Sequence, residues 1–207
     1  MEDKMKKKTL IGCGVVAAVF ILIGLILVLY GIRSYNNMVT MEEGVKEKWS
    51  QVENVYQRRL DLIPNLVETV KGYAAHERET LQAVTEARAK VGGTVNIGEE
   101  VLKNPAVFQQ FQQAQASLTS ALQRLMVVVE RYPDLKANEN FLQLQSQLEG
   151  TENRITVERR RFNEAARTFN TYIKQFPRVL MARMFGFIEK PYFKAQEGAD
   201  VAPKVTF

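Results

Sequence analysis

The stretch YQRRLDLIPNLVETV, residues 56–70, decides how many helices the chain forms. Apolar residues on both sides of it recur at three- and four-residue steps, which is typical of a helix with one buried face. Pro64 interrupts this pattern, because proline lacks the N–H that the interior of a helix needs. Two arrangements remain: Pro64 begins a second, antiparallel helix after a tight corner, or it kinks one helix of about 55 residues.

We favour the corner, because a helix of that length would leave its far half without partners of matching length. Asp61 would then cap the second helix by accepting from its unpaired N–H groups, and Pro64 would occupy the first turn, where no N–H is needed. An arginine of the pair Arg58 and Arg59 would return to Asp61 or to the end of the first helix. The predicted corner motif is Arg58, Arg59, Asp61, Pro64 and Asn65, with a binding site as the alternative.

Four segments around this stretch carry a helical apolar period. In the last of them, an apolar residue recurs every seven positions from Phe141 to Phe176, as in helices that supercoil around each other. We therefore predict an all-α fold, an antiparallel up-and-down four-helix bundle with coiled-coil packing. The predicted helices cover approximately residues 35–62, 64–91, 104–132 and 138–175.

Two helix boundaries can be predicted from particular residues. Gly92 and Gly93 are expected to stop the second helix, since glycine is common just after a helix. Asn104 and Pro105 are expected to begin the third, as N-cap and first helical residue. The connections 92–104 and 132–137 are predicted to be loops.

The N-terminal part of the chain is predicted to cross a membrane. Residues 9–32 carry no charge, and these 24 residues exceed the roughly 20 that a bilayer core requires. Four lysines within residues 1–8 place the N-terminus in the cytoplasm and the remainder on the other side, by the positive-inside rule. The predicted organisation is a cytoplasmic basic N-terminus (1–8), a transmembrane helix (9–32), a helical bundle (33–185) and an extended C-terminal tail (186–207).

The tail is expected to pack on the bundle, because it contains four aromatic residues, whereas disordered segments are poor in them. A flexible terminus that does not pack on the bundle is the alternative. The expected anchors are Phe187, Tyr192, Phe193 and Phe207.

Several functional classes are disfavoured by composition. The net charge of +5 is spread over intermixed basic and acidic residues, so nucleic-acid binding is not expected. The chain has one histidine, His76, and one cysteine, Cys13, so no His and Cys metal cluster is expected. His76 opens HERET, which lacks the second histidine of a zinc-protease motif. We expect no enzymatic activity and no cofactor.

The densest polar stretch is EGTENRITVERRRFN, residues 149–163. It forms either a buried polar layer that fixes helix register or a patch that binds a partner, and we favour the first. Asn163 and Asn170 are one heptad apart, so they could hydrogen-bond across helices. The candidate residues are Thr151, Glu152, Asn153, Arg154, Asn163 and Asn170.

Motifs over about residues 35–207 resemble the LemA family. They include YNNMV, RRLDLIPNL, YPDLKANENFLQLQSQLEGTENRI, RRRFNEAARTFNT and the terminal APKVTF, in that order. The resemblance implies a bacterial membrane protein with one N-terminal anchor and a helical bundle, and a biochemical role that is poorly defined. It also suggests one partner, a membrane-bound heat-shock zinc metalloprotease, whose gene often neighbours those of such proteins.

These observations favour a non-enzymatic, membrane-tethered scaffold or adaptor. It would present its bundle to partner proteins in envelope quality control, from a single-pass position in the bacterial inner membrane. The alternative is a self-assembling protein that organises the membrane. The expected partners are the lipid bilayer, a membrane-bound metalloprotease or another membrane protein, and further copies of the same chain.

Overall fold

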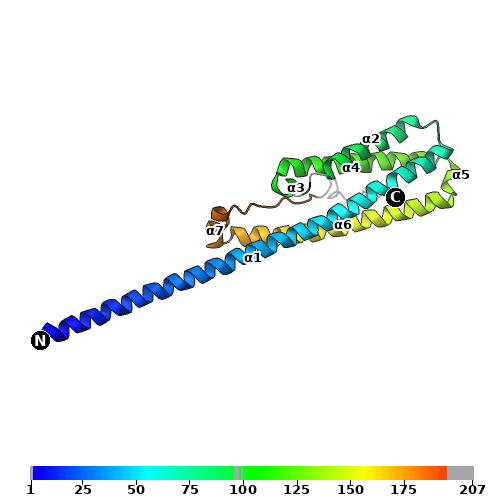
Figure 1. Ribbon diagram of the computed structural model, residues 1–207. Helices are drawn as coiled ribbons and strands as arrows, with labels where there is room; N and C mark the ends of the chain where they lie inside the picture. The colour runs from blue at the N-terminus through cyan, green and yellow to red at the C-terminus, as the bar shows by residue number, and fades with distance from the viewer. Residues whose placement is uncertain (1, 96–97, 99, 195–207) are drawn as a thin grey trace, which may run out of the picture.

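The structure is a computed structural model that describes residues 2–95, 98 and 100–194, apart from the side chains of residues 2–17 and 94–95. Its described elements are all helices, which confirms the predicted fold class. A long N-terminal helix leads into a packed helical bundle (Figure 1). The helices are α1 (Glu2–Tyr73), α2 (Arg78–Val95), α3 (Glu100–Lys103), α4 (Pro105–Val129), α5 (Pro133–Lys136), α6 (Glu139–Lys174) and α7 (Arg178–Phe185).

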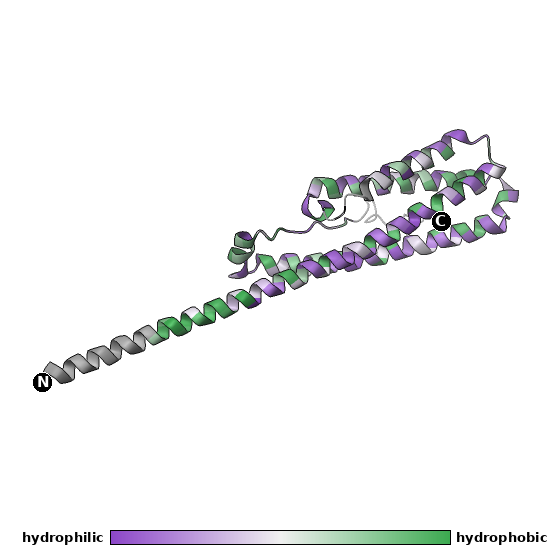
Figure 2. Cartoon of the chain, in the orientation of Figure 1, coloured by the Kyte–Doolittle hydropathy of each residue, from purple (hydrophilic) through white to green (hydrophobic). Residues whose placement is uncertain are grey.

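The longest helix, α1, joins the apolar segment to the bundle without a break. It has 72 residues, which corresponds to about 108 Å at about 1.5 Å per residue. Its apolar side chains from Val19 to Ile32 are exposed, whereas Ser34 is already buried against the bundle. Among the described residues, α1 is the one helix long and apolar enough to cross a membrane (Figure 2). The bundle therefore begins directly where the apolar segment ends.

The predicted corner at Pro64 is wrong, because α1 continues through this residue to Tyr73. The buried seam Leu60, Ile63, Leu66 and Val70 crosses the proline without interruption, and Pro64 itself is exposed. The prediction of a corner assumes that a long helix lacks partners. In the structure, α6 lies beside it and α2 packs against its end. The chain turns later, at residues 74–77.

Other boundaries agree with the sequence in part. Asn104 caps α4 as predicted, since its Oδ1 accepts from Ala106 N at 3.0 Å and Pro105 is the first helical residue. The predicted stop at Gly92 and Gly93 is wrong, because α2 runs through both to Val95. The fully buried Val91 holds this end of the helix on the core. The two predicted loops contain the single turns α3 and α5, which bury Val101, Leu102 and Leu135.

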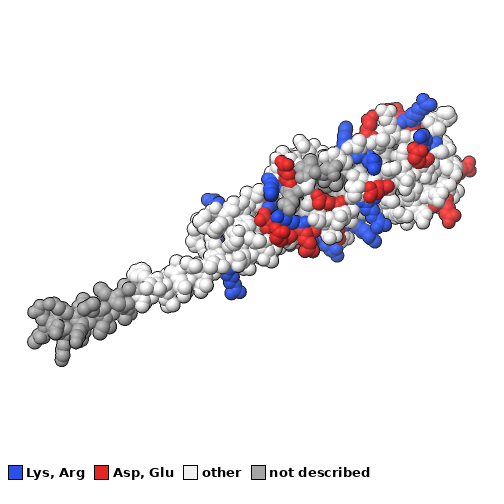
Figure 3. Space-filling model, viewed as in Figure 1, with Lys and Arg blue, Asp and Glu red and all other residues white. Residues whose placement is uncertain are grey.

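The bundle consists of two helix pairs. The bundle part of α1 pairs with the antiparallel α6, and α2 pairs with the antiparallel α4, so that the second pair covers part of the first (Figure 1). The short α7 lies at the base, beside α1. Charges of both signs cover the bundle, whereas the visible part of the apolar segment carries none (Figure 3).

The core has two parts of different composition. The part near the apolar segment is aromatic and contains Trp49, Phe108, Phe111, Phe162, Phe169 and Phe193. The distant part is almost entirely aliphatic, and extends from Leu60 on α1 and Leu118 on α4 to the far end of the bundle. Polar residues lie at the level where one part gives way to the other.

Candidate functional site

The residues of the predicted corner motif lie on different sides of one helix. Arg58, Asp61 and Asn65 are exposed, and Asp61 accepts a hydrogen bond from Gln57 Nε2 at 2.8 Å. Asp61 therefore does not cap a helix, because the helix has not ended at this position. Arg59, one residue along, is turned about 100° around the helix from Arg58 and is only 3% exposed.

Arg88 of α2 provides the hydrogen bond that Pro64 cannot make. In an unbroken helix, the carbonyl of Leu60 would accept from the N–H of residue 64, which proline lacks. Arg88 Nε donates to the Leu60 carbonyl at 3.0 Å instead. Leu60 is buried, so without Arg88 its carbonyl would be an unpaired acceptor inside the bundle. A tertiary contact thus makes proline tolerable within this helix.

The pairing of Arg88 with Pro64 can be tested by a double-mutant cycle. We expect Arg88→Met to lower the free energy of unfolding by about 1–2 kcal/mol, because it leaves the Leu60 carbonyl unpaired. In the Pro64→Ala background the same change should cost much less, since alanine restores the backbone N–H that proline lacks. Urea unfolding of the full chain in detergent, followed by Trp49 fluorescence, measures all four proteins. Equal costs of Arg88→Met in both backgrounds would contradict the assignment.

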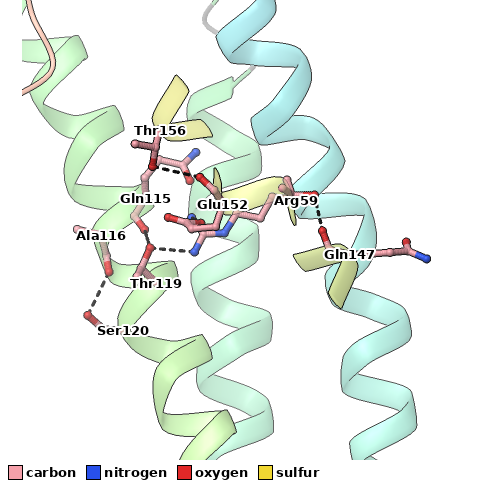
Figure 4. Close-up of polar contacts among 9 residues, drawn as sticks. Arg59, Gln115, Ala116, Thr119, Ser120, Gln147, Glu152 and Thr156 are labelled. Atoms are coloured by element: carbon pink, nitrogen blue, oxygen red, sulfur yellow. Dashed lines mark hydrogen bonds and ion pairs between the residues drawn. The ribbon is translucent and has the colours of Figure 1, made fainter. Parts of the chain in front are cut away.

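Arg59 is the centre of a polar layer between the two parts of the core (Figure 4). Its Nη2 donates to Thr119 Oγ1 of α4 at 2.8 Å, and its Nη1 lies 3.4 Å from Glu152 Oε2 of α6. Thr119 in turn donates to the carbonyl of Gln115 at 3.0 Å. One buried guanidinium therefore connects three helices and fixes their relative register.

The polar layer also holds groups that have no hydrogen-bond partner among the described residues. These are Arg59 Nε and both atoms of the Gln115 side-chain amide. Next to the layer, burial raises the pKa of Tyr56 to about 12, and the positive charges of Arg159 and Arg59 only partly oppose this effect. The phenol is therefore neutral in the folded protein over a wider pH range than in the unfolded chain.

The raised pKa of Tyr56 predicts a specific loss of stability in alkali. Above pH 10 the unfolded chain releases the phenolic proton while the folded chain keeps it, so stability falls as pH rises through this range. Relative to Tyr56→Phe, the unchanged protein should lose about 1 kcal/mol of unfolding free energy between about pH 9 and pH 11. Urea unfolding followed by circular dichroism measures both proteins. If the unfolding free energies of the two proteins changed in parallel with pH, the raised pKa of Tyr56 would be contradicted.

The predicted polar stretch divides between the core and the surface. Thr151 is buried and donates to the carbonyl of Gln147 at 2.7 Å, and Glu152 belongs to the polar layer although half of it is exposed. Asn153 and Arg154 are exposed on the outer face of α6. The two open interpretations therefore apply to different residues. Thr151 and Glu152 belong to a buried polar layer, whereas Asn153 and Arg154 form an accessible surface.

The two asparagines hold an extended segment of the chain, residues 187–194, against α6. Asn170 Nδ2 donates to the carbonyl of Lys190 and its Oδ1 accepts from Lys190 N, both at 2.8 Å. Asn163 makes the same pair of bonds with Phe193, both at 2.9 Å. Seven helical residues span about 10.5 Å and three extended residues about 10 Å, so the two spacings match. The prediction that these asparagines bond across helices is wrong.

Phe193 anchors this segment in the aromatic part of the core. It is 6% exposed, and its ring centroid lies 4.9 Å from that of Phe108, 5.6 Å from that of Phe162 and 6.1 Å from that of Trp49. The guanidinium of Arg159 lies 4.6 Å from the centre of the same ring. Phe193 thus fills a position that the surrounding helices would otherwise leave open.

Lys190 is a second anchor, which the aromatic pattern of the tail does not reveal. It is 3% exposed, its ammonium pairs with Glu42 of α1, and it lies 5.4 Å from the centre of the Phe169 ring. Two other predicted anchors in the described part of the tail also contact α6. Phe187 packs against Phe169, and the Tyr192 hydroxyl accepts from Asn170 Nδ2 at 2.9 Å. Phe207 and the rest of residues 195–207 lie outside the described residues.

The described residues bring no three His, Cys, Asp or Glu side chains together in a group that could hold a metal ion. Their polar groups instead connect helices, as Arg59 does, or hold an extended backbone, as Asn163 and Asn170 do. Fold and site define a class: a helical bundle, carried on one apolar helix, with its C-terminal segment bound along its side.

The chain belongs to the LemA family, whose model matches residues 48–207. Magnetosome protein MamQ 2 of Paramagnetospirillum magneticum is 30% identical over 181 residues, which cover 80% of this chain and 66% of that protein. Magnetosome protein MamQ of Magnetospirillum gryphiswaldense is 29% identical with the same coverage. Protein LemA of Metamycoplasma hominis is 27% identical over 162 residues, 78% of this chain and 69% of that protein. The chain thus spans just under two thirds of the length of the MamQ proteins.

Proposed function

We propose that this protein is a non-enzymatic, membrane-tethered scaffold or adaptor that presents its helical bundle to partner proteins. The observation that carries the proposal is the unbroken α1, which passes from the apolar segment into the bundle core. A flexible linker would let the bundle sample many positions, whereas a packed helix holds it at one height and orientation. A fixed surface close to the bilayer suits the binding of other membrane proteins.

The outer face of α6 is the surface that we propose for partner contact. Asn153 and Arg154 are exposed there, directly outside the layer that Arg59 holds in register. Polar and charged groups at such a surface favour specificity and rapid association. A membrane-bound metalloprotease of envelope quality control is the first partner to test, because the gene of such a protease often neighbours the genes of LemA proteins.

The orientation in the membrane is part of the proposal. Four lysines precede the apolar segment, which supports a cytoplasmic N-terminus and a bundle on the outer side of the bacterial inner membrane. Alkaline phosphatase fused after Phe207 should be active, since it requires export. An inactive fusion of normal abundance would contradict this orientation.

Copurification tests the adaptor role. The full chain, tagged at its N-terminus, is extracted in mild detergent, and copurifying membrane proteins are identified and quantified. We expect a stoichiometric partner that is lost in Asn153→Ala/Arg154→Ala and retained in the control Arg124→Ala, which changes an exposed arginine of α4. Equal recovery of every membrane protein with both variants would contradict a contact surface on α6.

Self-assembly is the second candidate function. Alignments with relatives named as proteins of the magnetosome cover 80% of this chain, which supports a test of whether the fold assembles. In that case the purified full chain should form larger particles as its concentration rises. Sedimentation velocity in detergent measures this, and a concentration-independent monomer would contradict self-assembly.

A further inference from the structure

A stripe of bulky apolar side chains is exposed along α7 and its flanks. Phe176, Leu180, Met184 and Ile188 follow one another at four-residue steps, and their exposed fractions are 81%, 59%, 70% and 44%. Leu180 and Met184 lie on the same face of α7, because they are four residues apart in a helix. Phe176 lies in the turn before α7, and Ile188 lies in the extended segment after it. Single exposed apolar residues are common on protein surfaces, but a group of four within 13 residues is typical of an interaction surface.

The position of α7 indicates what covers this stripe. It packs against α1 between Gly31 and Tyr35: a methyl group at Gly31 would lie 3.7 Å from Met181 Cε, and the Phe185 ring lies 4.8 Å from the Tyr35 ring. Gly31 is the penultimate residue of the uncharged segment 9–32. Helix α7 is therefore level with the end of that segment, where it would leave the hydrocarbon region of a bilayer (Figure 2).

Basic residues lie on α7 and on the parts of α1 and α6 next to it. Arg33, Lys174, Arg178 and Arg183 lie on α7 or at its immediate neighbours, whereas Glu189 is the nearby acidic residue in the sequence. Lys174 pairs with Glu189 at 2.7 Å, which leaves three arginines in excess. Apolar side chains beside an excess of basic ones are typical of helices that lie on anionic membrane surfaces.

We propose that α7 is an interfacial helix that binds the surface of the bilayer crossed by α1. The stripe enters the boundary between headgroups and acyl chains, and the arginines contact lipid phosphates. Tyr30 and Tyr35 occupy the same level, as interfacial aromatic residues do. The base of the bundle then has two attachments to the membrane, which prevents it from turning about α1. This contact is independent of any protein partner on α6.

Spin-label accessibility tests the proposal on the full chain. A single cysteine at Met184 in a Cys13→Ala background is labelled with a nitroxide, and one copy is placed in each nanodisc of phosphatidylcholine and phosphatidylglycerol. The matched control carries its label at Leu142, an exposed apolar residue of α6 at the far end of the bundle. Met184 and Leu142 are both exposed, so neither label displaces a core contact, and circular dichroism checks the fold.

We expect oxygen to relax the Met184 label more strongly than the Leu142 label, because oxygen partitions into lipid. A nickel chelate that stays in water should relax the Met184 label less than the Leu142 label. Two results would overturn the proposal. One is a Met184 label as accessible to the chelate as the Leu142 label, which places α7 in water. The other comes from a second preparation with two copies in each disc: protection of the Met184 label that appears only there, with spin–spin coupling between the copies, makes a second copy the occupant.

Discussion

Phe193→Ala is expected to cause the largest loss of stability of any single change in the tail, about 3–4 kcal/mol. The substitution empties a position surrounded by Trp49, Phe108, Phe111 and Phe162, and the helices that carry these rings cannot all move inward to fill it. Urea unfolding of the full chain in detergent measures the loss. The emission of Trp49, the one tryptophan, should also shift to the red as water reaches its ring.

Val127→Ala is the control for this experiment. It shortens an apolar side chain of α4 that is 69% exposed, so it should change the unfolding free energy by less than about 0.5 kcal/mol. A Phe193 variant as stable as the Val127 variant, with unchanged Trp49 emission, would show that the tail is not part of the core.

Asn170→Ala is the second large effect, with an expected loss of about 3 kcal/mol. Asn170 is 2% exposed and satisfies both the N–H and the carbonyl of Lys190, which is itself buried. Alanine leaves both backbone groups unpaired and removes the donor to the Tyr192 hydroxyl. Asn163→Ala should cost less, since Asn163 is only partly buried and water can replace its bonds. The same urea unfolding assay measures both variants.

Asn153→Ala provides the control for an exposed asparagine on the same helix, and it should be nearly neutral. Hydrogen exchange gives a second measurement: the amides of Lys190 and Phe193 should exchange faster in the respective variants, while amides in the middle of α4 keep their protection. If Asn170→Ala proved as mild as Asn153→Ala, the asparagines would not hold the tail.

The helix seams were largely predictable, because each depends only on apolar spacing within one segment. Within the predicted helices 35–62 and 104–132, apolar residues at three- and four-residue steps are indeed buried, among them Val45, Trp49 and Val52 in the first and Leu118, Leu122 and Leu125 in the second. The cap at Asn104 was predictable for the same reason, since its partner, Ala106, is two residues away.

The interpretation of Pro64 failed because the decisive residue is distant in sequence. A proline in a helix interior is unfavourable unless another group pairs with the carbonyl that it leaves free, and only the fold brings Arg88 to Leu60. The asparagine contacts failed for a similar reason: the heptad spacing of Asn163 and Asn170 was visible, but the path of the tail was not. The three-residue spacing of Lys190 and Phe193 is a signal that could have suggested the pairing.

The unbroken α1 relates the fold to the proposed function. It carries the apolar segment, the first bundle helix and the contacts with α7 in one continuous helix, so under the proposed function a partner bound to the bundle would act directly on the apolar segment. Arg59 and Arg88 stabilise this helix inside the bundle, and the extended segment 187–194 completes the aromatic part of the core.

The most direct test of the account is one distance across the junction of span and bundle. Nitroxides at Leu22 and Gln57, both exposed on α1, are introduced in a Cys13→Ala background, and double electron–electron resonance is recorded on the full chain in nanodiscs. An unbroken helix predicts a narrow distribution of the distance between the two nitroxides, centred at about 52 Å, because 35 residues separate the labels and each adds about 1.5 Å. A broad distribution, or one centred well below this value, would show a hinge between membrane and bundle and would contradict the rigid presentation on which the proposed function rests.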